Sequence, residues 1–252
     1  DFRRIPLSPH NVPVVLIGAG LLWFGWFGFN AGSALAANAL AGLAFVNTNT
    51  AAAAALLTWA LLDSARTGKM TAVGAATGAV VGLVGITPAA GFVTPSAAIA
   101  IGVLCAFVSY FAIQRRSRSR LDDSLDVFSC HGLAGIAGAL LTGVFASKLA
   151  NPAGNDGVLA GNPGQLLVQV YAVVAAIVIA VVGTIVILTI VRAVFGARVR
   201  IADEMEGLDL SEHGEEAYFA GDSALGGGGI AQSVIVSESE EPERREKSGV
   251  HD

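Results

Sequence analysis

Apolar residues in this chain form long blocks, and short polar segments separate one block from the next. A helix needs roughly 18 to 20 apolar residues to cross a bilayer, and six blocks reach or approach that length. Because lipid offers no hydrogen-bond partner to open backbone groups, each block must be helical. The pattern predicts an all-α polytopic membrane protein with six transmembrane helices, at residues 12–37, 39–62, 71–89, 96–113, 125–146 and 165–195.

Basic residues gather on alternate connections between these blocks. Lysine and arginine concentrate on the cytoplasmic side of membrane proteins. Up to residue 200, the other set of connections holds only Lys148. We therefore expect a protein of the cell membrane with both chain ends in the cytoplasm. An even number of crossings agrees with this, because it places both ends on the same side. The basic set comprises Arg3, Arg4, Arg66, Lys69, Arg115, Arg116, Arg118, Arg120, Arg192, Arg198 and Arg200.

Composition supports the membrane assignment. Hydrophobic residues make up 54% of the chain and charged residues 14%, whereas soluble domains hold about 25% charged residues. This balance excludes an ordinary soluble domain. The two cysteines, Cys105 and Cys130, lie in apolar blocks without the spacing of a metal site or a disulfide framework, so we expect them to be packing residues. We expect no enzyme activity, no cofactor, no metal and no nucleic-acid partner.

One histidine stands inside an apolar block. His131 lies in the stretch DDSLDVFSCHG at residues 122–132. An ionisable ring in a membrane segment is costly, and by default it indicates a substrate or proton path. Asp126 would point away from the face of His131, and the small residues on that face would leave a strip along which a narrow lumen could continue. At about 100° per residue this face holds Ser124, Phe128, His131, Gly135 and Gly138.

Small and polar residues at helical spacing favour close helix packing. The chain has 31 glycines, and Gly74, Gly78 and Gly82 recur every four residues. Small residues let membrane helices approach backbone to backbone. Asn47 and Thr48 begin the second block, where we expect interhelical hydrogen bonds or a helix cap.

The first block carries an aromatic and hydroxyl constellation. Trp26, Phe29 and Ser33 are spaced to share a helix face. Aromatic stripes are more often core or an interfacial belt than a site. Ring faces nevertheless attract cations and a hydroxyl accepts a hydrogen bond, so this face would suit the recruitment of a small cation.

Several motifs together resemble the ammonium transporter family, whose eukaryotic relatives include the Rhesus glycoproteins. The resemblance covers nearly the whole chain up to Tyr218, and its motifs follow one another in the family's order. They are GWFGFNAGSALAAN at 25–38, NTNTAAAAALLTWALLD at 47–63, GITPAAGFVTP at 85–95, DDSLDVFSCHG at 122–132 and EGLDLSEHGEEAY at 206–218.

This resemblance implies a homotrimer in which each subunit has its own pore, built from eleven helices as two halves of inverted topology. Ammonium is recruited at the outer face, passes a phenylalanine gate, loses a proton and crosses a hydrophobic lumen lined by two hydrogen-bonded histidines. Carried over by motif, Phe29 matches one gate phenylalanine, and Trp26 and Ser33 match residues near the outer vestibule. His131 matches the second of the paired histidines.

The chain departs from the family's pattern at its beginning. The family's first pore histidine lies in the fifth helix, ahead of the PHN motif found here at residues 9–11, and His10 on a cytoplasmic flank cannot replace it. The six predicted helices match helices six to eleven. We therefore expect this chain to be an incomplete half that does not conduct alone.

Beyond residue 200 the composition becomes polar. We divide the chain into a transmembrane domain at 1–200, a cytoplasmic C-terminal region at 201–218 and an acidic tail at 219–252 that we expect to be disordered. The resemblance implies that the middle region packs under the pores and interacts with PII signalling proteins.

Two other functions remain open. One is a non-transporting ammonium sensor, although the tail is too short and too polar for a signalling enzyme. The other is a facilitator of another small neutral molecule such as carbon dioxide, although the face of Trp26, Phe29 and Ser33 favours a cation. The permeating species, whether ammonia, ammonium or ammonia plus a proton, also stays open.

Overall fold

The computed structural model describes residues 9–119, 123–196 and 198–215, and every regular element in these ranges is helical. The predicted acidic tail at 219–252 lies outside the described residues, as do residues 216–218 of the predicted C-terminal region. The chain divides into two units, residues 1–181 and 182–252, and each is described by itself.

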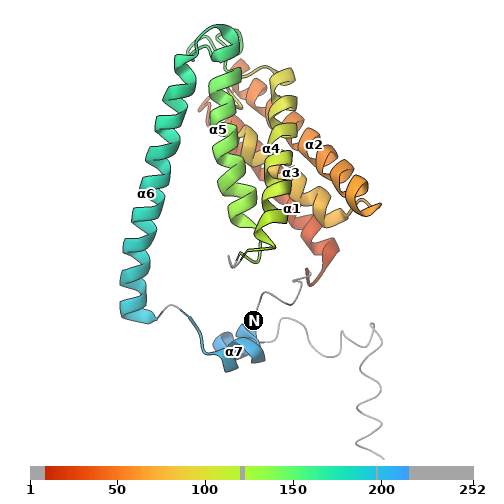
Figure 1. Ribbon diagram of the computed structural model, residues 1–252, viewed down its shortest axis with the longest axis vertical. Coiled ribbons are helices and arrows are strands. Elements are labelled where there is room, and N and C mark those ends of the chain that lie inside the picture. The colour runs from red at the N-terminus through yellow and green to blue at the C-terminus, as the bar shows by residue number, and fades with distance from the viewer. Residues whose placement is uncertain (1–8, 120–122, 197, 216–252) are drawn as a thin grey trace, which may run out of the picture. The chain divides into compact units, whose positions relative to one another are not determined.

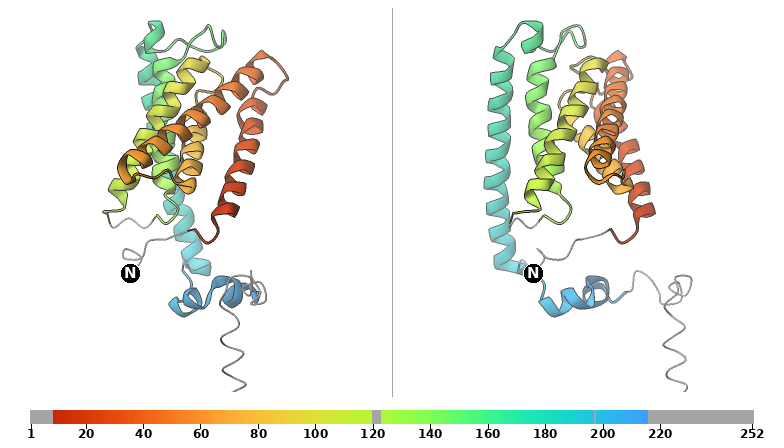
Figure 2. Two further views of the ribbon diagram at one scale, coloured as in Figure 1. Left: turned by 90° about the vertical axis from the view of Figure 1, so that its right-hand side faces the viewer. Right: turned by 45° about the vertical axis from the view of Figure 1, so that its right-hand side comes forward.

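The first unit holds helices that run up and down in alternation (Figures 1 and 2). They lie where the hydrophobic pattern predicts them, which confirms the all-α membrane fold. Their bounds are α1 Val12–Gly32, α2 Ala39–Thr67, α3 Ala72–Ile86, α4 Pro95–Arg116, the π-helix η1 Phe128–Leu133, which continues directly into α5 Ala134–Phe145, the short η2 Val158–Ala160, and α6 Gly164–Phe195, which extends into the second unit. The second unit also holds α7 Ile201–Glu206 and α8 Leu208–His213.

Five of these helical segments are long and apolar enough to cross a membrane, namely α1, α2, α4, η1 with α5, and α6. The sixth predicted crossing, α3, is apolar but only 15 residues long, because the chain turns after Ile86. The first helix is also shorter than predicted. It ends at Gly32, and Leu35 takes a positive φ of 54° in the turn before Asn38 caps α2.

Polar caps fix where four helices begin. The side chains of Asn11, Asn38, Thr71 and Thr94 each accept a hydrogen bond from a backbone N–H in the first turn of α1, α2, α3 and α4. Such caps satisfy donors that have no partner inside the helix. We call the end of the first unit with residues 9–11, 68–71, 117–119 and 123–127 the basic end, and the end with residues 33–38, 87–94 and 146–163 the opposite end.

Helices α2, α3 and α4 meet around one alanine of α2. Ala51 is fully buried, and Gly82 of α3 and Gly102 of α4 both face its backbone. A Cβ atom on Gly102 would stand 3.0 Å from Ala51 Cα, and one on Gly82 would stand 2.7 Å from the neighbouring Ala52 Cα. Neither position has room for a side chain, so these helices pack backbone to backbone, as small residues allow in membranes.

Buried amides and hydroxyls hold the helices in register, as predicted for Asn47 and Thr48. Asn47 of α2 is fully buried and donates to the carbonyl oxygens of Ala90 and Val93, each at 2.8 Å. Thr48 accepts a hydrogen bond from Asn30 of α1 at 3.0 Å. These bonds satisfy polar groups that lipid could not, and they confirm the expected interhelical bonding.

A close contact also joins α3 to α5. Gly138 is buried, and a Cβ atom placed on it would overlap the carbonyl group of Gly85 and stand 2.9 Å from Gly85 Cα. A Cβ atom on Gly135 would only touch Val84 Cγ1 at 3.8 Å, an ordinary contact. Gly138 therefore packs against α3, and the open strip expected along the face below His131 does not extend to this position.

The two glycines of α5 give a matched stability test. Alanine is favoured over glycine in a helix by about 1 kcal/mol at either site. At Gly138 this gain should be outweighed, because the added methyl group forces α3 and α5 apart at a cost of about 1 to 3 kcal/mol. We expect Gly138→Ala to lower the thermal unfolding midpoint in detergent while Gly135→Ala leaves it equal or higher. Equal midpoints for the two variants would contradict the packing described for Gly138.

Candidate functional site

His131 lies on the π-helix η1, near the basic end, and its side chain is exposed. In a π-helix each backbone hydrogen bond spans five residues, one more than in an α-helix. Single π-turns are frequent at functional sites. The residue before it, Cys130, is buried with 4% exposure. The imidazole of His131 therefore points outward from an otherwise apolar helical segment, while the adjacent Cys130 faces the core.

The start of η1 differs from the expected helix. Asp126 has a positive φ of 55°, and the helical turns begin after it. Ser124 therefore lies outside the helix and does not share the face of His131, which corrects that part of the helical-face prediction. Asp126 instead accepts a hydrogen bond from Arg116 Nε of α4 at 2.7 Å. The carboxylate of Asp123 accepts from the backbone N–H groups of Val127 and Phe128, each at 2.9 Å.

The aromatic and hydroxyl residues of α1 gather at the opposite end. The rings of Trp26 and Phe29 pack edge to face with centroids 5.8 Å apart, and Phe29 is 61% exposed. Ser33 is the C-cap of α1, and its hydroxyl donates to the Phe29 carbonyl oxygen at 2.6 Å. With its proton committed to the backbone, the Ser33 oxygen keeps its lone pairs for an outside donor.

A threonine that sequence reasoning missed holds Trp26 in place. Trp26 Nε1 donates to Thr87 Oγ1 at 2.7 Å, and that hydroxyl donates to the Leu83 carbonyl oxygen at 2.7 Å. Thr87 follows directly after α3, so the indole links α1 to the end of α3. Its membership of the GITPAAGFVTP motif was a usable signal, but no pattern in the sequence pairs it with Trp26.

The predicted residues therefore lie in two separate candidate sites within the first unit. Trp26, Phe29 and Ser33 come together near the end of α1, whereas His131 lies where the α5 segment begins, at the other end of the bundle (Figure 1). Within the described ranges, no group of three or more His, Cys, Asp or Glu side chains is placed to hold a metal ion. The chemistry available is hydrogen bonding, cation–π attraction and proton exchange at one imidazole.

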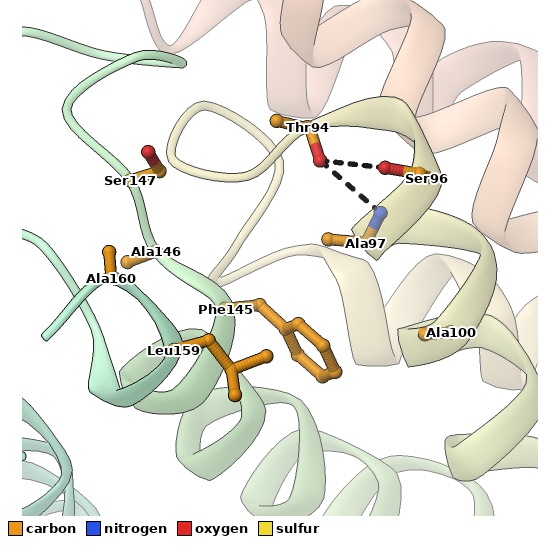
Figure 3. Close-up of a pocket in the computed structure, with 9 residues that line it drawn as sticks. All are labelled: Thr94, Ser96, Ala97, Ala100, Phe145, Ala146, Ser147, Leu159 and Ala160. Carbon is orange, nitrogen blue, oxygen red and sulfur yellow. Dashed lines mark hydrogen bonds between the residues drawn. The ribbon is translucent and has the colours of Figure 1, made fainter.

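A pocket of about 360 Å³ opens at the opposite end between the start of α4 and the chain around η2 (Figure 3). The Phe145 ring and Leu159 supply its apolar part. Thr94 Oγ1 and Ser96 Oγ are 3.0 Å apart on its rim. None of the predicted site residues lines it, so this pocket is distinct from both sites.

The sequence and the fold are both similar to those of known proteins. Residues 2–218 match the model of the Ammonium Transporter Family. The ammonium transporter of Aquifex aeolicus is 50% identical over 213 residues, which cover 84% of this chain and 50% of that protein. The crystal structure of Candida albicans Mep2 superposes with a TM-score of 0.74 at 37% identity, covering 84% of this chain and 48% of that one.

A structure titled Sensor Amt Protein is also similar, with a TM-score of 0.71 at 32% identity over 81% of this chain and 49% of that one. The chain thus spans about half the length of the relatives it matches. The residues matched by the family model include the aromatic segment of α1 and the histidine of η1. The chain belongs to the ammonium transporter family.

Proposed function

We propose that this chain supplies half of a pore that carries ammonium or ammonia across the cell membrane. The observation that carries the proposal is the exposed imidazole of His131 on the π-turn of an apolar helix, in a chain of this family. A membrane protein has no reason to leave such a ring uncovered unless water, a permeant or a partner histidine faces it. In this proposal the second histidine comes from the half that this chain does not contain.

The site on α1 is the recruitment point in this proposal. Ammonium is a small cation with N–H donors, and the exposed Phe29 ring and the Ser33 oxygen offer a π face and an acceptor side by side. Thr87 keeps the Trp26 indole against Phe29, so both rings are set before the cation arrives. The phenylalanine then acts as the gate.

Deprotonation of ammonium lowers the free energy of crossing the hydrophobic lumen. A bare ammonium ion in hydrocarbon loses its hydration, which costs far more than transferring neutral ammonia. His131 can hydrogen-bond ammonia, and an imidazole takes up and releases a proton near neutral pH. It therefore orients the permeant and passes the proton to its partner ring. An electric current across the bilayer during uptake would show that a proton crosses together with ammonia, whereas neutral ammonia alone would carry no current.

The assembly and partners in this proposal follow from the family resemblance. We place both chain ends in the cytoplasm, expect a homotrimer, and assign the C-terminal region to contact with a PII signalling protein. The described part of that region, α7 and α8, carries several carboxylates that a basic partner surface could meet: Asp203, Glu204, Glu206, Asp209 and Glu212.

The similarity to the Sensor Amt Protein supports ammonium sensing as the second candidate function. Both functions need ammonium recognition at α1, but only transport needs passage beyond His131. Uptake measurements therefore separate the two.

Substitution of the histidine tests the pore. In the full protein that contains this chain, we expect His131→Ala to abolish selectivity for ammonium over potassium, because the lumen then offers no imidazole to the deprotonated permeant. Uptake with potassium as competitor, measured in proteoliposomes, gives the result. His10→Ala serves as the control histidine and should keep selectivity. Unchanged selectivity in His131→Ala would remove the proposed role.

Removal of the α1 hydroxyl tests recruitment. We expect Ser33→Ala to raise the half-saturating ammonium concentration about fivefold, because one hydrogen bond to a cation is lost. Ser96→Ala is the matched control, since that hydroxyl lies at the same end but bonds Thr94 in a separate pocket. A constant half-saturating concentration in Ser33→Ala would place recruitment elsewhere.

The chain on its own gives a third test. We expect it to reach the membrane of an ammonium-uptake-deficient cell without restoring growth on low ammonium, because the faces of His131 and Phe29 lack cover. An immunoblot of membranes controls for expression, and the complete Aquifex aeolicus relative controls for the strain. Growth rescue by the chain alone would contradict the idea of an incomplete half.

A further inference from the structure

Helix α4 contacts the segment that carries His131 at three positions along its length. Arg116 Nε donates to Asp126 just before η1, at 2.7 Å. Ser109 Oγ donates to the Ser129 carbonyl oxygen inside η1, at 2.9 Å. Cys105 Sγ lies 3.8 Å from the Ala134 carbonyl oxygen, where α5 begins. Positions 105, 109 and 116 share one face of α4 at about 100° per residue.

The middle contact is fully enclosed. Ser109 is 0% exposed and Ser129 is 1% exposed, so neither lipid nor bulk water reaches this hydrogen bond. The Ser109 hydroxyl is therefore a buried donor to one carbonyl oxygen of the π-turn. Its removal would take a hydrogen bond from that carbonyl in a place where neither lipid nor bulk water can replace it, which is costly in a membrane protein.

The contact with Arg116 holds the residue that precedes the helical turns. Asp126 holds a left-handed backbone conformation, which aspartate tolerates better than most residues. Its carboxylate is bonded to Arg116, and its carbonyl oxygen accepts from Cys130 N–H at 2.8 Å. The Arg116 bond therefore anchors the residue from which the first helical turn starts.

The register of this turn decides which way His131 faces. One residue more or fewer in a turn rotates the residues on one side of it by about 100° relative to the other side. Cys130 points into the core and His131 points outward in the observed register. A relaxed α-helical register would carry Cys130 out of the core and turn the imidazole away from its present direction.

We propose that Ser109 and Arg116 are positioning residues that hold the π-turn in register and thereby aim the His131 imidazole. The inference rests on the proposed function for the importance of that aim, but the structural part stands independently of transport. Ser109 acts through the backbone of η1 and Arg116 through Asp126 just before it, so neither side chain occupies the exposed imidazole.

Labelling of Cys130 with N-ethylmaleimide tests the register directly. The full protein that contains this chain is reconstituted in lipid and labelled, and peptide mass spectrometry resolves Cys130 from Cys105. We expect Ser109→Ala to speed Cys130 labelling about tenfold, as the loss of one buried hydrogen bond allows. Ser109→Thr keeps the hydroxyl and should restore slow labelling. Thr77→Ala, which removes a hydroxyl bonded only within its own helix, should leave the rate unchanged.

Arg116→Gln is the second test and perturbs the core less, because the Arg116 side chain is partly exposed. It should also speed Cys130 labelling, while the fully buried Cys105 stays unlabelled in every folded variant. If Ser109→Ala does not fold, Arg116→Gln decides alone. Unchanged Cys130 labelling in the folded variants would overturn the register control.

Selectivity of the full protein completes the experiment. Faster labelling together with reduced selectivity for ammonium over potassium supports positioning of His131. Faster labelling with full selectivity overturns the link to the imidazole. A failure of the proposed function is distinct from both outcomes, since His131→Ala would then keep its selectivity whatever the labelling rates show.

Discussion

Backbone-to-backbone contact between α2, α3, α4 and α5 is the constraint on which the rest of the structure depends. The contacts run through positions without room for a side chain, such as Gly102 against Ala51 and Gly138 against Gly85. In lipid there is little hydrophobic gain from bringing helices together, so dense contact has to come from small residues. This packing sets how far apart the helices stand and therefore where longer side chains can point.

Hydrogen bonds across the helices then fix their register within that packing. Asn47 ties α2 to the connection after α3, and Trp26 ties α1 to Thr87. Ser109 ties α4 to the turn that carries His131. Each bond satisfies a group that is costly to leave alone in a membrane, so a shift of one helix would break it. These bonds therefore set the positions of Trp26 and of the turn that carries His131.

Two parts of the site differ in how they are built. Trp26, Phe29 and Ser33 come from one helix and its C-cap, so local geometry alone nearly assembles them. His131 depends on an irregular turn that a neighbouring helix stabilises. The first arrangement has one hydrogen bond to another helix, from Trp26 to Thr87 at the end of α3. The second has contacts with α4 through both Ser109 and Arg116.

The sequence by itself determined the helices and their approximate limits, because apolar blocks of this length have few other stable conformations in lipid. It also determined the face shared by Trp26 and Phe29, since spacing along one helix fixes that. Its motifs sufficed to identify the family, which the family match confirms.

Only the tertiary structure decided the end of α1 at Gly32, the π-turn around His131 and the burial of Gly138 against Gly85. A regular rotation of 100° per residue predicted one open face with Ser124 at one end and Gly138 at the other. In the structure Ser124 lies outside the helix and Gly138 is buried, so the predicted open face is shorter at both ends. The reason is physical: the backbone of Asp126 leaves Ser124 outside the helix, Gly138 packs against Gly85 of another helix, and no periodicity within the segment encodes either feature.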